Sequence, residues 1–285
     1  MRETLGKCIS VRFVEAGRSR GSEEDRIRRG YTKYRSWRVA SLTHIDNASP
    51  YVLPFHLSSS TLCPMTSSPP PSLVHIIRHG QALHNVDHSY PHRDPPLTTA
   101  GAQATTKLKP PNTPDLIIIS PMTRTIQTAI NMFPFLSGTN NCSVPVQIWP
   151  DLREAHDAIC NKGVSRAELQ TRYPQFDFAE CHEEWDYAVH TIENATIRAE
   201  RVRSRLQELS LTYKTIAVIT HRGFIAYLVQ GLRFQPSETR MYRFATEEES
   251  MTDELRRGVH CETLDELDFG PTLLLRYEGS HADTD

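Results

Sequence analysis

The sequence predicts an α/β fold of three layers, with a largely parallel central sheet and helices on both of its faces. Short apolar runs at 73–77, 116–119 and 215–220 have the length of strands buried on both faces of a sheet. Helical patterns with one apolar face, such as 122–133 and 192–209, separate these runs. Strands that alternate with helices favour parallel pairing.

The first strand, 73–77, ends at Arg78-His79-Gly80, which we interpret as its exit loop. The second strand, 116–119, is followed by Ser120-Pro121. A serine N-cap with proline at the first helical position predicts a helix that begins there. The apolar residues that follow fall on one helix face: Met122, Ile126, Ala129, Ile130 and Phe133.

Further elements follow the same alternation. We expect a strand at 146–149, a long helix over 192–209 and a strand at 215–220 that ends at His221. Ile225, Leu228, Val229 and Leu232 then indicate another helix, and 272–277 has the pattern of a last strand. No internal repeat occurs.

The first 64 residues differ from the rest of the chain. They carry a net charge of +5 against −7 for the remainder, and they lack convincing periodicity. We expect 1–64 to be a disordered leader, or upstream sequence ahead of a true start at Met65. The arginines and serines also suit a transit peptide, although the acidic cluster at 23–25 weakens that interpretation. A Pro/Ser linker at 65–72 then leads to one domain at 73–285.

Composition excludes several classes of protein. The total net charge of −2 argues against a nucleic-acid partner, and no apolar run reaches the 18 residues of a membrane span. The start lacks the apolar segment of a secretory signal. The six cysteines form no Cys-x-x-Cys pair, so we expect free thiols in the cytoplasm and no zinc ribbon.

Basic and imidazole groups follow three of the predicted strands. His79 follows the first, Ser120 and Arg124 the second, and His221 a later one. Because ligands bind at the carboxyl ends of the strands in such sheets, we expect these groups to meet at one edge. A histidine beside an arginine at a strand end is a candidate nucleophile toward phosphate, and Gly80 would let the backbone approach an anion.

Five motifs then identify a family. They are R-H-G-x-x-x-x-N at 78–85, D-x-x-L-T-x-x-G-x-x-Q at 94–103, S-P-x-x-R-x-x-Q-T-A at 120–129, L-x-E at 152–154 and T-H-x-G at 220–223. In this order they resemble the motifs of the histidine phosphatase superfamily, in its phosphoglycerate mutase-like branch, across residues 72–278.

The resemblance implies a role for each matched residue. His79 would attack phosphorus and carry the phosphoryl group, and Glu154 would protonate the leaving alkoxide and then activate water. Arginine forks and imidazoles would hold the phosphate. The catalytic set is then His79, Glu154, His221 and Arg78, and the substrate-binding set is Arg124, Asn85, Gly80, Gln81 and Arg222.

Departures from the family pattern narrow the subgroup. Gln81-Ala82-Leu83-His84 stands where mutases carry Glu-Ser-x-Trp, which argues against glycolytic mutase activity, and it also differs from the acid phosphatase pattern. Arg222 replaces a common glycine. Cys160-Asn161-Lys162-Gly163 and the stretch 173–178 resemble a fungal and plant subgroup of broad-specificity phosphatases, with Asn161 where aspartate is commoner.

Some assignments stay open. Asp157 or His156 could be the acid in place of Glu154, and His84 with His88 could form a metal pair, although flanking the pocket is the better interpretation. A lid at 155–190 could recognise a polyanion or an apolar group. The candidate side chains for a polyanion are Arg153, Lys162, Arg166 and Arg172. Those for an apolar group are Trp149, Phe176, Phe178, Trp185 and Tyr187.

The predicted function is that of a phosphomonoesterase that acts on a small phosphorylated metabolite through a phosphohistidine. No metal or cofactor is expected, because arginines and imidazoles supply the positive charge. Two alternatives remain: a non-hydrolytic step, such as dehydration or rearrangement in a biosynthetic pathway, and a non-catalytic protein that binds a phosphorylated ligand. The sequence indicates no oligomeric state.

Overall fold

The computed structural model describes residues 70–110, 112–138 and 144–279. They belong to a compact unit that spans Met65–Asp285. The expected leader at 1–64 and the linker residues 65–69 lie outside the described residues.

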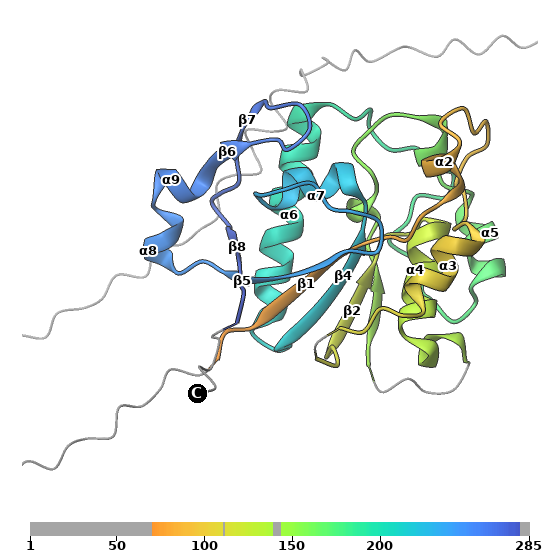
Figure 1. The fold of residues 1–285 in the computed structure, drawn as a ribbon, viewed down its shortest axis with the longest axis horizontal. Coiled ribbons are helices and arrows are strands. Elements are labelled where there is room, and N and C mark those ends of the chain that lie inside the picture. Colours follow the sequence, from red (N-terminus) through yellow and green to blue (C-terminus); the bar gives the residue numbers. More distant parts are fainter. Residues whose placement is uncertain (1–69, 111, 139–143, 280–285) are drawn as a thin grey trace, which may run out of the picture. The chain divides into compact units, whose positions relative to one another are not determined.

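A six-stranded sheet forms the centre of this unit (Figure 1). Its strands, in spatial order, are β3 (Val146–Ile148), β2 (Leu116–Ile119), β4 (Thr215–Thr220), β1 (Leu73–Arg78), β5 (Thr239–Phe244) and β8 (Leu274–Arg276). The first four pair in parallel, whereas β5 is antiparallel to both β1 and β8. The predicted, largely parallel α/β sheet is therefore confirmed.

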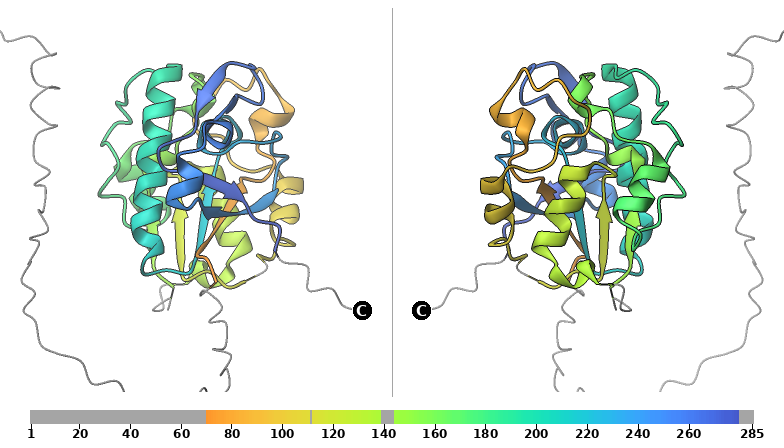
Figure 2. Two further views of the ribbon diagram at one scale, coloured as in Figure 1. Left: turned by 90° about the vertical axis from the view of Figure 1, so that its left-hand side faces the viewer. Right: turned by 90° about the vertical axis from the view of Figure 1, so that its right-hand side faces the viewer.

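Helices cover both faces of the sheet, as the two side views in Figure 2 show for α6 and α4. The helices are α2 (Leu83–Val86), α3 (Thr99–Thr105), α4 (Thr123–Met132), α5 (Arg166–Arg172), α6 (Ile192–Ser210), α7 (Arg222–Leu228), α8 (Glu247–Ser250) and α9 (Asp253–Arg256). Short 3₁₀ turns occur at Pro134–Ser137, Pro150–Leu152 and Ile159–Asn161.

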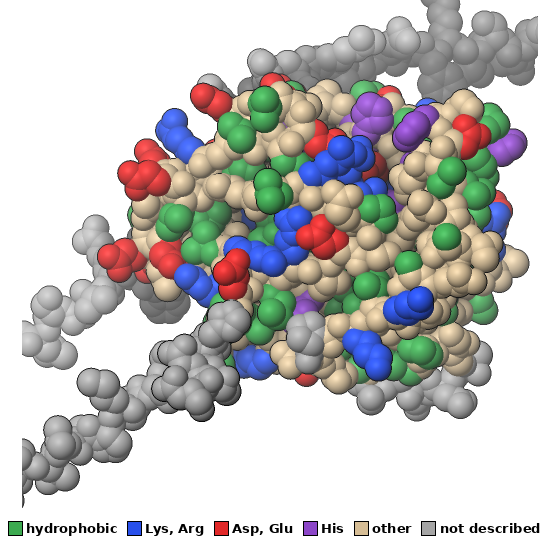
Figure 3. Space-filling view, in the orientation of Figure 1, with side chains coloured by type: hydrophobic (Ala, Val, Ile, Leu, Met, Phe, Trp, Pro, Cys, Tyr) green, Lys and Arg blue, Asp and Glu red, His purple; other side chains and the backbone are tan. Residues whose placement is uncertain are grey.

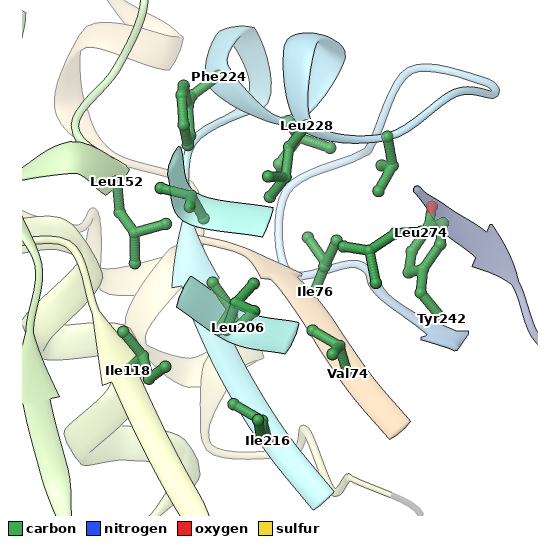
Figure 4. Packing of buried hydrophobic residues seen from close by; sticks show 14 of the residues in the cluster. Val74, Ile76, Ile118, Leu152, Leu206, Ile216, Phe224, Leu228, Tyr242 and Leu274 are labelled. Carbon is green, nitrogen blue, oxygen red and sulfur yellow. The ribbon is translucent and has the colours of Figure 1, made fainter. Parts of the chain in front are cut away.

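Side-chain alternation along the strands divides the core around the sheet into two clusters, and a third, smaller cluster holds Leu267, Phe269 and Leu273. Val74 and Ile76 of β1 pack with residues of α6 and α7, and Figure 4 shows part of this cluster. Ile77 points to the other face, where it joins residues of α4 and of the segment 164–185. Because strands with apolar residues on both faces are held from both sides, the loops at their carboxyl ends start from fixed positions.

Two predicted helix boundaries are wrong. The helix expected at Ser120-Pro121 begins at Thr123, with Met122 as its N-cap. The Ser120 hydroxyl does not cap the helix because it is hydrogen-bonded to His221. The helix expected over 225–232 covers Arg222–Leu228, since Val229 is already extended.

The sequence pattern missed three strands. β5 was not expected, and neither was the hairpin of β6 (Arg257–Val259) and β7 (Glu266–Asp268). The expected last strand, 272–277, is shorter and corresponds to β8. Most positions of β5 are only half-buried, so polar residues interrupt the apolar pattern that marks a buried strand.

Within the described ranges, no helix has both the length and the apolar character needed to cross a membrane.

Candidate active site

The carboxyl ends of β1, β4 and β2 bring the three expected segments together. Backbone hydrogen bonds continue past the strands: the N–H of His79 donates to Thr220 O at 3.0 Å, and that of Ser120 donates to Ile219 O at 3.0 Å. His221 follows β4 directly, and the rings of His79 and His221 lie 5.2 Å apart, centroid to centroid. The sheet therefore places both imidazoles at one edge.

A cavity of about 500 Å³ opens at this edge. In the upper part of the molecular face drawn in Figure 3, basic, acidic and histidine side chains lie close together. Its walls come from the β1 exit and α2, the loop 154–161, the start of α7 and the hairpin region. The lining residues are Arg78, His79, His84, Asn85, His88, Tyr90, Glu154, Ala155, His156, Ala158, Ile159, Cys160, Asn161, Arg222, Gly223, Tyr227, His260, Glu262 and Thr263.

His79 is held in one tautomer. Its Nδ1 lies 2.7 Å from the carbonyl oxygen of Gly80. Since a carbonyl only accepts, Nδ1 carries the proton and Nε2 keeps a free lone pair. Burial, followed by the charges of Arg124 and Arg78, holds the pKa of His79 well below its usual value. At neutral pH this side chain is an uncharged imidazole with a nucleophilic nitrogen.

His221 is fully buried beside it and contacts Ser120. The Ser120 Oγ and the His221 Nε2 are 2.8 Å apart. Burial and the charge of Arg124 keep the pKa of His221 well below its usual value, so this ring is also neutral. Its Nδ1 is buried and has no hydrogen-bond partner among the described residues.

Arg78 and Arg124 are buried, and their guanidinium groups donate to carbonyl and amide oxygens. Arg78 donates from Nη1 to Phe234 O at 2.7 Å. Arg124 donates to the loop, from Nη1 to Cys160 O at 3.1 Å and from Nη2 to the Asn161 Oδ1 at 3.0 Å. Across the described chain, neither guanidinium forms an ion pair with a carboxylate. The Nε of each is also buried without a partner.

Glu154 lines the cavity and rests on the first turn of α7. Its Oε1 accepts from the N–H of Ala155 at 2.7 Å, and its Oε2 accepts from that of Gly223 at 3.2 Å. A Cβ at position 223 would lie 2.5 Å from Oε1, so only glycine leaves room for the carboxylate. Asp157, one of the alternative acids, is exposed and does not line the cavity, whereas His156 does.

Three expected substrate-binding residues, Gly80, Gln81 and Arg124, do not line the cavity, and neither does the expected catalytic residue His221. The Gly80 N–H donates to Thr128 Oγ1 at 3.0 Å, and a Cβ on Gly80 would lie 2.6 Å from Thr105 Cγ2. Glycine is therefore required here by packing and not by the approach of an anion. The Gln81 side chain points elsewhere, because its Oε1 accepts from Thr98 Oγ1 at 2.9 Å.

Asn85 and Arg222 do line the cavity, each with partners of its own. The Asn85 Oδ1 accepts from Ala82 N at 3.0 Å, and its Nδ2 lies 3.1 Å from His84 Nε2. The Arg222 Nε lies 2.6 Å from Glu262 Oε1. His84 and His88 also line the cavity. The described part of the chain holds no group of three His, Cys, Asp or Glu side chains that fits a metal ion.

Neither set of candidate lid residues lines the cavity. Among the basic ones, Arg166 pairs with Glu183 at 2.9 Å, and Arg153 lies over the Tyr187 ring. The aromatic ones are core residues instead. Trp149 packs in the α6 cluster, and Phe176, Phe178, Trp185 and Tyr187 pack in or against the α4 cluster.

Several lining residues were missed by the sequence analysis. Tyr227 belongs to α7, and His260, Glu262 and Thr263 lie in the loop of the β6–β7 hairpin. No motif or periodicity marks this loop. A run of polar residues between two short strands gave no signal that the loop returns to the cavity.

Comparison with known proteins agrees with this geometry. Residues 74–270 match the histidine phosphatase superfamily (branch 1). A probable phosphatase of Schizosaccharomyces pombe is 31% identical over 159 residues, which are 52% of this chain and 73% of that protein. The adenosylcobalamin/alpha-ribazole phosphatase of Escherichia coli is 29% identical over 181 residues, 61% of this chain and 84% of that protein.

Among solved structures, a putative alpha-ribazole-5'-P phosphatase from Escherichia coli is 23% identical with a TM-score of 0.44, and the match covers 62% of this chain and 92% of that one. The family match extends over most of the chain, and it includes the β1, β2 and β4 ends together with Glu154. These matches confirm the expectation of an enzyme of the phosphatase class. The chain belongs to the histidine phosphatase superfamily.

Proposed function

We propose that the protein is a metal-independent phosphomonoesterase that hydrolyses small phosphorylated metabolites through a phosphohistidine on His79. One observation carries the proposal. Arg78 and Arg124, two buried guanidinium groups without a carboxylate partner among the described residues, act on the neutral imidazole of His79, and His79 and Arg78 line the cavity.

The unpaired charges favour an anion as the ligand. A buried charge is costly unless it is paired and hydrogen-bonded. The Nε atoms of Arg78 and Arg124 and the Nδ1 of His221 are three buried nitrogens without partners in the described structure. A phosphoryl group offers oxygens to several donors at once, and guanidinium groups match its geometry.

The first step transfers the phosphoryl group to the enzyme. The Nε2 of His79 attacks phosphorus, the N–P bond forms and the bond to the ester oxygen breaks. Glu154, protonated for this step, gives its proton to the departing alkoxide. The hydrogen bond from Nδ1 to Gly80 O holds the ring as positive charge develops on it. The two arginines and His221 stabilise the charge on the phosphoryl oxygens.

The second step releases phosphate. Glu154, now a carboxylate, takes a proton from a water molecule, and the resulting oxygen nucleophile attacks phosphorus. The N–P bond breaks, its electron pair returns to Nε2, and inorganic phosphate leaves. The chain's own residues return to their starting protonation states.

The central experiment combines turnover with trapping. His79→Asn is expected to abolish hydrolysis of an aryl phosphate, whereas His92→Asn, an exposed histidine that does not line the cavity, serves as the matched control. Quenching the wild type with a ³²P-labelled substrate should yield an acid-labile, base-stable phosphoenzyme. Turnover by His79→Asn would refute the mechanism.

The same experiment separates the alternatives. A protein that only binds phosphorylated ligands, or one that catalyses a dehydration or rearrangement, would release no phosphate in a metabolite screen. Glu154→Gln should slow phosphoryl transfer but keep binding of inorganic phosphate. If Asp157→Asn does so instead, the acid is assigned to the wrong residue. We further propose that 73–285 is the catalytic domain and that it acts in the cytoplasm.

A further inference from the structure

The β6–β7 hairpin supplies one wall of the cavity. In Figure 1 this hairpin and α2 lie on either side of α7. Its loop contributes His260, Glu262 and Thr263 to the cavity. None of these residues takes part in the chemistry proposed above, so they are free to contact the leaving group of a substrate.

Glu262 cancels positive charge at the cavity wall. Its Oε1 lies 2.6 Å from the Nε of Arg222 and 3.3 Å from that of Arg233. Apart from Arg78, Arg222 is the only Arg or Lys among the described lining residues, and it is already paired with Glu262. A second phosphate or a carboxylate on the substrate would therefore find no free cation there and would face the Glu262 carboxylate.

The remaining polar groups on this wall are neutral. The Nδ1 of His260 accepts from the N–H groups of Glu262 at 3.3 Å and Thr263 at 3.1 Å. The proton of this neutral ring is therefore on Nε2, which is buried without a partner in the described structure. On α2, which also lines the cavity, burial is the main cause that lowers the pKa of His84 to about 3, so this ring is uncharged as well. Such groups suit hydroxyl or carbonyl oxygens.

We propose that this cavity selects phosphomonoesters whose leaving group is uncharged or cationic and rejects those with a second anionic group, and that Glu262 is the residue that sets this preference. The inference rests on the proposed function. It names Glu262 as a specificity residue and His260 as a neutral hydrogen-bond donor to the leaving group.

The test uses three aryl phosphates that differ in one para substituent: carboxymethyl, carbamoylmethyl and aminomethyl. The methylene group insulates the leaving oxygen, so the substituent changes mainly the charge of the distal group. For the wild type we expect kcat/KM for the carboxymethyl ester to be roughly 5- to 10-fold below that for the carbamoylmethyl ester. The aminomethyl ester should equal or exceed the neutral one.

Glu262→Gln should abolish or invert this preference, because Arg222 and Arg233 would then be free to bind the carboxylate. Glu266→Gln is the matched control, since it removes the same charge from the same hairpin at an exposed position outside the cavity. It should keep the wild-type ratio.

Each result decides between the two proposals. Equal kcat/KM for all three esters in the wild type, or an unchanged ratio in a folded Glu262→Gln variant, would overturn the inference and leave the phosphatase intact. Failure of the wild type to hydrolyse any ester would overturn the proposed function and the inference with it. If Glu262→Gln does not fold, the wild-type series alone decides.

Discussion

Gly223→Ala is expected to separate catalysis from stability. The added Cβ would lie 2.5 Å from the Oε1 of Glu154, whereas ordinary contact begins at 3.4 Å. Because the clashing atom is the end of a flexible side chain, the backbone of α7 need not move. The carboxylate must instead retreat by almost an ångström, away from the proton acceptor it would serve.

The magnitude follows from that displacement. A misplacement of about 1 Å in a catalytic group costs roughly 100-fold in rate. We therefore expect kcat/KM for phenyl phosphate, a poor leaving group, to fall by about that factor. An ester that needs little acid, such as 2,4-dinitrophenyl phosphate, should lose far less. The melting temperature should stay the same or rise slightly, since alanine is a better helix former than glycine by about 0.5–1 kcal/mol.

The assay compares kcat/KM for both esters in four proteins: the wild type, Gly223→Ala, Glu154→Gln and the double variant. If the alanine acts by displacing Glu154, adding it to Glu154→Gln should cost little more. Additive losses, equal losses for both esters or wild-type rates with phenyl phosphate would each refute this account of Gly223.

Three further predictions concern the buried site. The lowered pKa values of His79 and His221 mean that below the ordinary value of 6.5 the unfolded chain binds more protons than the folded one, so stability falls as pH falls through that range. Each ring contributes up to about 1.4 kcal/mol per pH unit to this change in the free energy of unfolding. Melting curves between pH 7 and 5 test this, and His221→Asn should make the stability depend less steeply on pH. The Asn161 Oδ1 lies 3.0 Å from the Arg124 Nη2, so Asn161→Asp places a carboxylate next to this guanidinium. Because the carboxylate would pair with the charge that is proposed to bind phosphate, KM for an aryl phosphate should rise about 10-fold and inhibition by inorganic phosphate should weaken. The same loss in Asn161→Ala would count against charge pairing. Ser120→Ala leaves the buried Nε2 of His221 without a partner and should lower the free energy of unfolding by about 1–3 kcal/mol in urea titrations, whereas an unchanged value would mean that this hydrogen bond adds nothing.

The central part of the site could be predicted from the sequence because it depends on local patterns. Each strand is a short apolar run, and parallel strands bring their carboxyl ends together. His79, Arg124 and His221 needed only their positions after those runs to be placed at one edge. Glu154 follows β3 at the same edge, so the motif and the topology agree.

The sequence neighbours of His79 were harder to assign. Gly80 and Gln81 adjoin His79 in sequence, but their backbone and side chains bond to Thr128 and Thr98 on other helices or loops. Which way a loop residue faces depends on these distant partners, and no local pattern encodes them. The hairpin residues were missed for the same reason: their place at the cavity results from long-range strand pairing.

The hairpin also has a simple connection to the rest of the fold. The chain leaves the sheet at the end of β5, forms the segment 245–273 and returns at β8, which pairs with β5. A hydrogen bond of 2.9 Å from the Ala245 N–H to Leu273 O closes its base. The segment is thus an insertion between two paired strands at the edge of the sheet. Changes in its length and sequence can therefore reshape one wall of the cavity, while the strands that lead to His79 and His221 stay as they are.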